Sequence, residues 1–300
     1  MDVKALRGSL LLLLGSAIWG AAFAAQRVGM DHIGPFAFTG IRMLLAGLVM
    51  IPVSLYAGKK QKTRPSARQQ TKGGLLCGLF LFAATCLQQV GLVSTDAGKA
   101  GFITALYVVL VPVAGWLILK KSPGKIILAG VALALLALYL LCAPASGLRM
   151  ETGDLLLLGC AVCFTGQILC VDRFAPRVSG SALARDEFLV TGFLSMLIAL
   201  FTEEISADGV LEAAVPILYT GLFSSAVAYT LQIVGQRDTD PTLASLIMCL
   251  ESVFAVLAGA VLLGERMNAR EISGCALMFA AVILAQLSPV IQRKRPRKKT

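Results

Sequence analysis

The residues best suited to chemistry in this chain are polar side chains inside long apolar segments. Glu251 stands ten residues into the apolar run 241–263. A charge at that depth of a membrane costs about 2.5 to 3.5 kcal/mol to insert, so its presence needs a reason. The carboxylate either binds a solute or a proton in a cavity, or makes a structural hydrogen bond to a neighbouring helix. We favour the first interpretation.

Neutral polar and aromatic residues recur at helical spacing on five other segments, which places each set on one helix face. The sets are Trp19, Phe23 and Gln26; Thr85, Gln88 and Gln89; Thr104 and Tyr107; Cys163 and Gln167; and Tyr229 and Gln232. Interhelical hydrogen bonds, which average about 0.6 kcal/mol, would explain any single set. The repetition favours one shared polar cavity. We predict these substrate-binding residues: Trp19, Gln88, Thr104, Tyr107, Gln167, Tyr229, Gln232 and Glu251.

Arg42 is the other ionisable residue deep in an apolar segment, about a third of the way into 34–57. It either extends toward the outer head groups or ties its helix to neighbouring helices, and we favour the structural role. Its counterpart, by a shift of 145 residues, is Glu187. Inverted halves would place the two toward opposite faces, so the correspondence does not make them an ion pair.

The sequence predicts no catalytic residue, metal site or cofactor. Cys160 and Cys163 form a CxxC pattern, but within an apolar helix such small side chains usually pack. The single histidine, His32, lies in a predicted outer loop. Eight cysteines in a membrane-embedded chain imply no disulfide framework.

The elements that must position these residues are membrane helices. Hydrophobic residues make up 57% of the 300 residues and charged residues only 15%, so lipid must be the main solvent. Continuously apolar segments predict an all-α fold rather than a barrel. We expect ten spans of about 20 residues: 8–28, 34–57, 73–93, 98–119, 124–143, 153–172, 186–201, 212–234, 241–263 and 271–290. The seventh is the shortest and draws on Asp186 and Glu187.

The chain also contains an internal repeat. Residues 87–140 align with residues 231–284 by a shift of 144, without a gap and with 18 of 54 positions identical. In this alignment Gln88 matches Gln232, and Tyr107 corresponds to Glu251. The predicted units are a first five-helix repeat, 1–145, a second one, 146–290, and a basic tail, 291–300. Because five spans is an odd number, the second unit must be inverted relative to the first.

The first span imitates a signal peptide, with Lys4, Arg7 and a small-residue pattern at 22–24. Residues 11–17, however, correspond to 155–161 inside the chain, so we interpret this segment as a span. With ten spans, 21 Lys and Arg residues fall on the side of the termini and five on the other. Both termini and the 58–72 loop are therefore predicted to be cytoplasmic. The net charge of +10 indicates contact with anionic lipid head groups and not with nucleic acid.

These motifs resemble the EamA-type transporters of the drug/metabolite transporter (DMT) superfamily. The resemblance covers residue 8 to about residue 289 and is carried by Trp19-Gly20, by Arg42 in 42–46, and by the stretches 104–112, 250–254 and 263–265. It implies ten helices in the bacterial inner membrane, a central cavity lined by helices one, three, four, six, eight and nine, and small organic metabolites, amino acids or drugs as substrates. The family often has proline after the ninth-helix glutamate. Ser252 stands there in this chain, which leaves the bend of that helix open.

The prediction is therefore a secondary transporter, as an exporter, that works by alternating access with a small-molecule substrate. Two other classes stay open. An intramembrane enzyme would need an Asp-rich diphosphate motif or a histidine cluster, and neither pattern is present in the sequence. A passive channel or an assembly subunit does not account for a two-half repeat.

Overall fold

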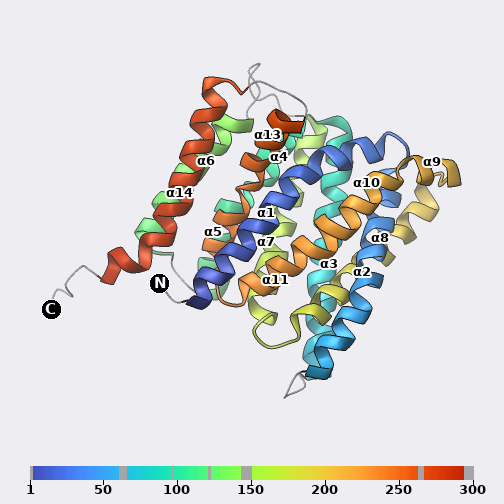
Figure 1. Cartoon of the computed structure of the whole chain (residues 1–300), viewed down its shortest axis with the longest axis horizontal. Coiled ribbons are helices and arrows are strands. Elements are labelled where there is room, and N and C mark those ends of the chain that lie inside the picture. The colour runs from blue at the N-terminus through green and yellow to red at the C-terminus, as the bar shows by residue number, and fades with distance from the viewer. Residues whose placement is uncertain are drawn as a thin grey trace.

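A computed structural model describes residues 3–60, 66–95, 97–120, 123–142, 151–262 and 267–293. Every regular element in these ranges is a helix, which confirms the predicted all-α class. The helices lie side by side in one bundle, and the first helix begins at the end of the bundle where the last one ends (Figure 1).

Over the described residues, helices account for most of each of the ten predicted spans. The elements of the first part are α1 (Val3–Met30), α2 (Pro35–Lys60), α3 (Ala67–Ser94), α4 (Ala97–Thr104), α5 (Tyr107–Leu119) and α6 (Lys125–Cys142). Those of the second part are α7 (Thr152–Phe174), α8 (Gly180–Thr202), α9 (Ala207–Glu212), α10 (Ala214–Tyr219), the π-helix η1 (Thr220–Tyr229), α11 (Thr230–Gln236), α12 (Pro241–Met248), α13 (Glu251–Leu262) and α14 (Ala269–Arg293).

Eight helical stretches within the described residues are long and apolar enough to cross a membrane. They comprise α1, α2, α3, α7 and α14 together with the stretches 99–118, 214–236 and 241–258. The α6 helix is apolar but shorter, and α8 is 23 residues long with three consecutive charged residues, 185–187. The protein is therefore a multi-pass membrane protein.

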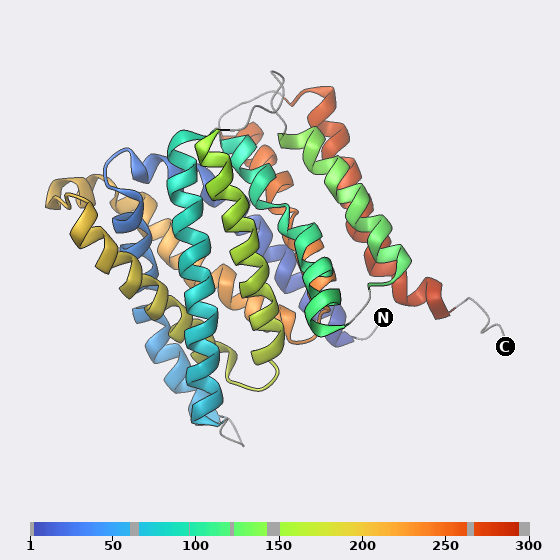
Figure 2. The ribbon, with the colours of Figure 1, turned by 180° about the vertical axis from the view of Figure 1, so that it is seen from behind.

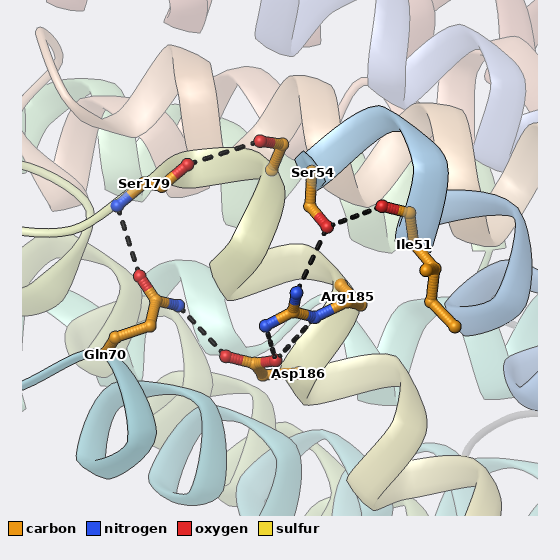
Figure 3. A network of polar contacts seen from close by, with 7 residues as sticks. Ile51, Ser54, Gln70, Ser179, Arg185 and Asp186 are labelled. Atoms are coloured by element: carbon orange, nitrogen blue, oxygen red, sulfur yellow. Dashed lines mark hydrogen bonds and ion pairs between the residues drawn. The ribbon is translucent and has the colours of Figure 1, made fainter. Parts of the chain in front are cut away.

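The seventh predicted span is longer than its apolar part indicated. Helix α8 begins at Gly180 and not at Asp186. It keeps its charged residues because each is buried or bonded inside the bundle. Asp186 pairs with Arg185, with 2.6 Å between Oδ1 and Nη2, and Gln70 on α3 donates to its other oxygen at 3.0 Å (Figure 3). Hydropathy alone does not show such pairing.

Two predicted spans are interrupted. The helix is interrupted at residues 105–106, between α4 and α5, and at residues 249–250, between α12 and α13. The two interruptions are separated by 144 residues. At both breaks the first amide bonds four residues back and the second only three residues back, which tightens the turn. Ser252 does not prevent the break before Glu251, so proline is not required for it. The matched geometry agrees with the internal sequence repeat.

The stretch 220–229 differs from its counterpart in the first half. It is a π-helix, whereas the corresponding residues 76–85 lie in the regular helix α3. Such segments are rare and occur often at functional sites.

Helices of the two sequence halves pack closely against each other. Helix α3 contacts α7 and α8, α2 lies along α8, and α6 pairs with α14 at one edge of the bundle (Figure 2). One buried cluster joins α5, α6 and α12 to α14, and a second joins α2, α3, α7, α8 and α11. The core therefore forms between the halves and not within each half alone.

Several sequence predictions concern residues outside the described ranges. They are the boundary between the halves at 143–150, part of the basic loop at 61–65, the motif 263–265, and most of the tail, 294–300.

The contact between α3 and α8 depends on small residues, as the Gly74 and Gly78 spacing indicates. A Cβ added at Gly78 would lie 2.6 Å from Cβ of Val190 and 3.1 Å from the backbone oxygen of Glu187. We expect Gly78→Ala to destabilise the protein by about 1 to 3 kcal/mol, measured by unfolding in detergent. Gly115→Ala is the control, because nothing lies within 4 Å of its added Cβ. Equal stability of the two variants would contradict the packing argument.

Candidate functional site

A cavity of about 50 Å³ lies inside the bundle, between the two helix breaks. All eight predicted substrate-binding residues line it: Trp19, Gln88, Thr104, Tyr107, Gln167, Tyr229, Gln232 and Glu251. They come from α1, α3, α4, α5, α7, η1, α11 and α13. Helical spacing and the repeat together therefore predicted side chains that converge on one cavity.

The two interrupted helices meet at the cavity. The hydroxyl of Tyr107 donates to Oε1 of Glu251 at 3.3 Å, and the two residues are 144 positions apart. The Cys249 thiol lies 3.7 Å from the carbonyl oxygen of Ala105, which is the equivalent pair two residues earlier. Tyr107 is 5% exposed and Glu251 8% exposed. The site is therefore built around the contact between symmetry-related residues of the two halves.

Glu251 is the first residue of α13. The amide dipoles of a helix favour negative charge at this end, so the break supplies the carboxylate with a partial positive charge in addition to the Tyr107 hydroxyl. An unbroken helix would not offer free amides there. The break thus provides a physical reason why a carboxylate is tolerated at this depth.

A chain of buried amides leads away from the cavity. Nε2 of Gln232 donates to Oε1 of Gln167 at 3.0 Å and to Oε1 of Gln236 at 3.0 Å. Nε2 of Gln167 is 3.5 Å from Oε2 of Glu187, which is fully buried. The other oxygen of Glu187 has no hydrogen-bond partner among the described residues. Glu187 is therefore a second buried carboxyl group, connected to the cavity through Gln167.

Aromatic rings form part of the cavity wall. The indole N–H of Trp19 donates to the carbonyl oxygen of Ser224 in the π-helix at 2.9 Å. The Trp19 and Tyr229 rings meet edge to face at 4.8 Å between centroids, and Tyr107 meets Phe164 at 6.4 Å. Such rings fix the shape of a pocket and bind apolar or cationic parts of a solute.

The predicted structural role for Arg42 was incomplete. The residue is 2% exposed and lines the cavity, so extension of its side chain to the outer head groups is wrong. Its guanidinium carbon lies 5.7 Å from the centroid of the Phe38 ring. Arg42 and Glu187 form no ion pair in the described structure. The depth of the cation in its segment was the sequence signal for this enclosed position.

Further residues outside the predicted set also line the cavity. Phe23 and Gln26 share the helix face of Trp19, so their position followed from the same pattern. Phe164, Ile168, Ser224 and Met248 also line the cavity. Conversely, Thr85, Gln89 and Cys163 share faces with site residues but do not line it. Thr85 instead donates to the carbonyl oxygen of Leu81 at 2.8 Å.

The size of the cavity limits what it holds in this conformation. A volume of about 50 Å³ accommodates a few water molecules. Sites for drug-sized ligands are usually about 300 to 1,000 Å³. Any larger solute therefore requires the cavity to widen. Among the described residues, no group of three or more His, Cys, Asp or Glu side chains is placed to hold a metal ion.

The model of the EamA-like transporter family matches the chain twice, at residues 6–143 and 151–287. The chain belongs to the EamA-like transporter family. The two matches coincide with the repeated halves, and the predicted membership is confirmed. Membership of this family also confirms that the protein is a membrane transporter.

Named relatives cover most of this transporter. An uncharacterized transporter of Archaeoglobus fulgidus is 33% identical over 95% of this chain and 87% of its own length. The S-adenosylmethionine/S-adenosylhomocysteine transporter of Chlamydia muridarum is 25% identical over 85% and 84%. The uncharacterized inner membrane transporter YedA of Escherichia coli K12 is 25% identical over 93% and 90%. A solved crystal structure with 20% identity superposes with a TM-score of 0.78 over 96% of this chain and 99% of that one.

Proposed function

We propose that this protein is a secondary transporter that exports a small organic solute by alternating access. Ten helices in two inverted five-helix repeats would form the pathway, and the eight cavity residues would bind the substrate. The proposal includes Arg42 among the substrate contacts. The coarse assignment as a membrane transporter follows from the family; substrate class, direction and mechanism are the proposed part.

The observation that carries the proposal is the hydrogen bond between Tyr107 and Glu251 across the cavity. Symmetry-related residues of two halves meet there, so a rotation of one half against the other would open this contact. The small volume of the cavity supports the same view, because a solute enters only when the halves move. Two related halves around a central site are the general architecture for alternating access.

The side chains in the cavity support a small organic solute with polar groups and an apolar body. Glu251 and Arg42 offer opposite charges, four Gln residues offer amides, and five aromatic residues form apolar walls. The Chlamydia relative is named for the transport of S-adenosylmethionine and S-adenosylhomocysteine, which are small organic solutes. Export as the direction rests on the resemblance to family exporters.

Flux measurements on reconstituted liposomes test the proposal. The full chain is reconstituted with a panel of radiolabelled metabolites, amino acids and drugs inside or outside the vesicles. Saturable, protein-dependent flux of at least one solute is expected. Flux that rises linearly with concentration without saturation would indicate a channel, and absence of flux across the panel would contradict the transport proposal.

The orientation in the inner membrane is also a proposal. It is supported by the distribution of Lys and Arg and by the name of the Escherichia coli relative. In intact cells, a membrane-impermeant maleimide should label Asp208→Cys, at the exposed helix α9, and should not label Ala67→Cys, at the exposed start of α3. Each variant is compared with the unsubstituted chain, which has its own cysteines. The reverse labelling pattern would invert the topology.

A further inference from the structure

A hollow of about 430 Å³ lies at the end of the bundle where α3 begins and α7 ends. Among the described residues, four cationic side chains line it: Arg68 and Lys72 from α3, and Arg173 and Arg177 from α7. Ser66, Gln69 and Phe174 also line it. We propose that this hollow, separate from the central cavity, binds the phosphate group of an anionic ligand and thereby joins the two halves of the transporter at this end.

The four charges are not neutralised by the described part of the protein. No carboxylate in the described ranges forms an ion pair with any of the four cations. Asp186 follows Arg177 by nine residues, but one of its oxygens pairs with Arg185 and the other accepts a hydrogen bond from Gln70 (Figure 3). Like charges from two helices that face one hollow repel each other unless an anion lies between them.

The usual reason for basic residues at a helix end explains only half of the cluster. Arg173 and Arg177 stand at the C-terminus of α7, where cations are favoured by the helix dipole, and Arg177 donates to the carbonyl oxygen of Arg173. Arg68 stands in the first turn of α3, where the dipole disfavours a cation. The orientation rule for membrane proteins asks for basic residues on this side but not for their convergence on one hollow.

The start of α3 adds donors of the kind that phosphate accepts. Helix α3 has no acidic residue in its first turn, and no side chain of the described residues caps its amides. Free amides at a helix N-terminus bind phosphate oxygens, and arginine binds them through two parallel hydrogen bonds. Guanidinium groups and an ammonium group therefore line the hollow, and the uncapped start of α3 lies beside it.

The position of the hollow between α3 and α7 gives the proposed site its consequence. These helices belong to different halves and pack along each other. Gln70 fixes the start of α3 to the segment before α8, because its Oε1 accepts from the backbone N–H of Ser179 at 3.2 Å (Figure 3). One wall of the hollow is thus held in place. A phosphate bound to both walls would oppose separation of the halves at this end.

The test uses the full chain in a neutral detergent. Binding of three probes is measured: dioleoyl-phosphatidylglycerol, dioleoyl-phosphatidylcholine as the zwitterionic control, and inorganic phosphate. Two variants each remove two charges from the hollow, Arg68→Gln with Lys72→Gln, and Arg173→Gln with Arg177→Gln. The matched control, Lys125→Gln with Arg237→Gln, removes two exposed charges that do not line the hollow.

We expect an anionic probe to bind the wild type and to bind both hollow variants about tenfold or more weakly, because each Lys or Arg near an anionic membrane surface contributes about 1 kcal/mol of binding free energy. Binding to the control pair should equal binding to the wild type. Preference for phosphatidylglycerol over inorganic phosphate assigns the site to lipid head groups. Equal dependence of inorganic phosphate binding on the hollow residues assigns it to a soluble phosphate compound. An equal loss in the control pair, or binding of phosphatidylcholine with the same affinity, would overturn the proposal.

A second measurement separates binding from folding. Without any anion, removal of like charges relieves repulsion, and the α3 dipole does not favour Arg68, so Arg68→Gln with Lys72→Gln should unfold at the same temperature as the wild type or higher. A lower unfolding temperature of this variant without anion would show that these two cations are structural and would overturn the proposal. Failure of this site would leave solute flux through the central cavity untouched, so the two proposals are distinguishable.

Discussion

Replacement of Glu251 by Gln is expected to reduce solute flux by about tenfold or more and to remove its dependence on pH. The carboxylate is the only acidic group in the lining of the described cavity and accepts a hydrogen bond from Tyr107 at 3.3 Å. A hydrogen bond to a charged group contributes about 1.5 to 3 kcal/mol, and 1.4 kcal/mol is a tenfold change. Gln keeps the shape and an acceptor oxygen but neither titrates nor binds a cation by charge. The measurement is liposome flux at a series of pH values.

The controls for Glu251→Gln separate loss of function from loss of fold. Glu204→Gln makes the same chemical change at an exposed position outside the cavity and should leave flux unchanged. Gln88→Ala and Gln232→Ala should have weaker effects than Glu251→Gln, because each removes a neutral group. Wild-type flux with an unchanged pH profile in folded Glu251→Gln protein would return this residue to a packing role.

The central cavity could be predicted because two independent sequence signals agree there. Helical spacing placed Gln88 and Gln232 on inward faces, and the shift of 144 residues related them to each other. The cost of a charge in the membrane then singled out Glu251. All three residues line the cavity. Hydropathy and symmetry therefore determine which helix faces converge, even without knowledge of how the helices are tilted.

The local backbone could not be predicted to the same degree. The breaks at 105–106 and 249–250 contain neither glycine nor proline, so no local signal marks them. They arise where the two interrupted helices pack against each other, with Cys249 against Ala105. The π-helix at 220–229 likewise depends on a distant contact, since Trp19 donates to the carbonyl oxygen of Ser224. Tertiary contacts decided these details.

Arg42 shows why single residues are harder to assign than faces. Its depth in the segment was visible in the sequence, but a long side chain reaches either the head groups or the interior. The structure encloses it, with Gly221 of the π-helix placed so that an added Cβ would lie 3.1 Å from the Arg42 backbone oxygen. The close approach of η1 to α2 thus shields Arg42 from the lipid. A single sequence does not reveal that contact between two halves.

One end of the bundle contains a buried ion pair that has no symmetry-related counterpart. Lys99 at the start of the 99–118 stretch and Asp154 on α7 form an ion pair with 2.6 Å between Nζ and Oδ2. The residues related to them by the 144-residue shift are Leu243 and Leu10, which are apolar. The repeat is therefore symmetric at the cavity and asymmetric at this ion pair. Under the alternating access proposed above, such a difference between the ends would favour one closed side over the other.

Lys99→Met is expected to destabilise the protein by about 3 to 5 kcal/mol, the usual effect of removing one partner of a buried ion pair. Lys99 is 8% exposed at its side chain and Asp154 is 0% exposed, so the variant leaves a carboxylate inside the bundle without its lysine partner. The measurement is chemical unfolding of the full chain in detergent micelles. Lys125→Met, at an exposed position, serves as the control and should change stability by less than about 0.5 kcal/mol.

The double variant Lys99→Met with Asp154→Asn tests whether Lys99 stabilises the protein through its ion pair with Asp154 or through packing. Asn removes the charge but keeps an oxygen to accept the backbone N–H of Glu151, which lies 2.7 Å from Oδ2 of Asp154 and caps α7. We expect the double variant to regain most of the stability lost in Lys99→Met, because no unpaired carboxylate then remains. A double variant as unstable as Lys99→Met, or less stable, would show that Lys99 stabilises this end by packing and not by pairing with Asp154.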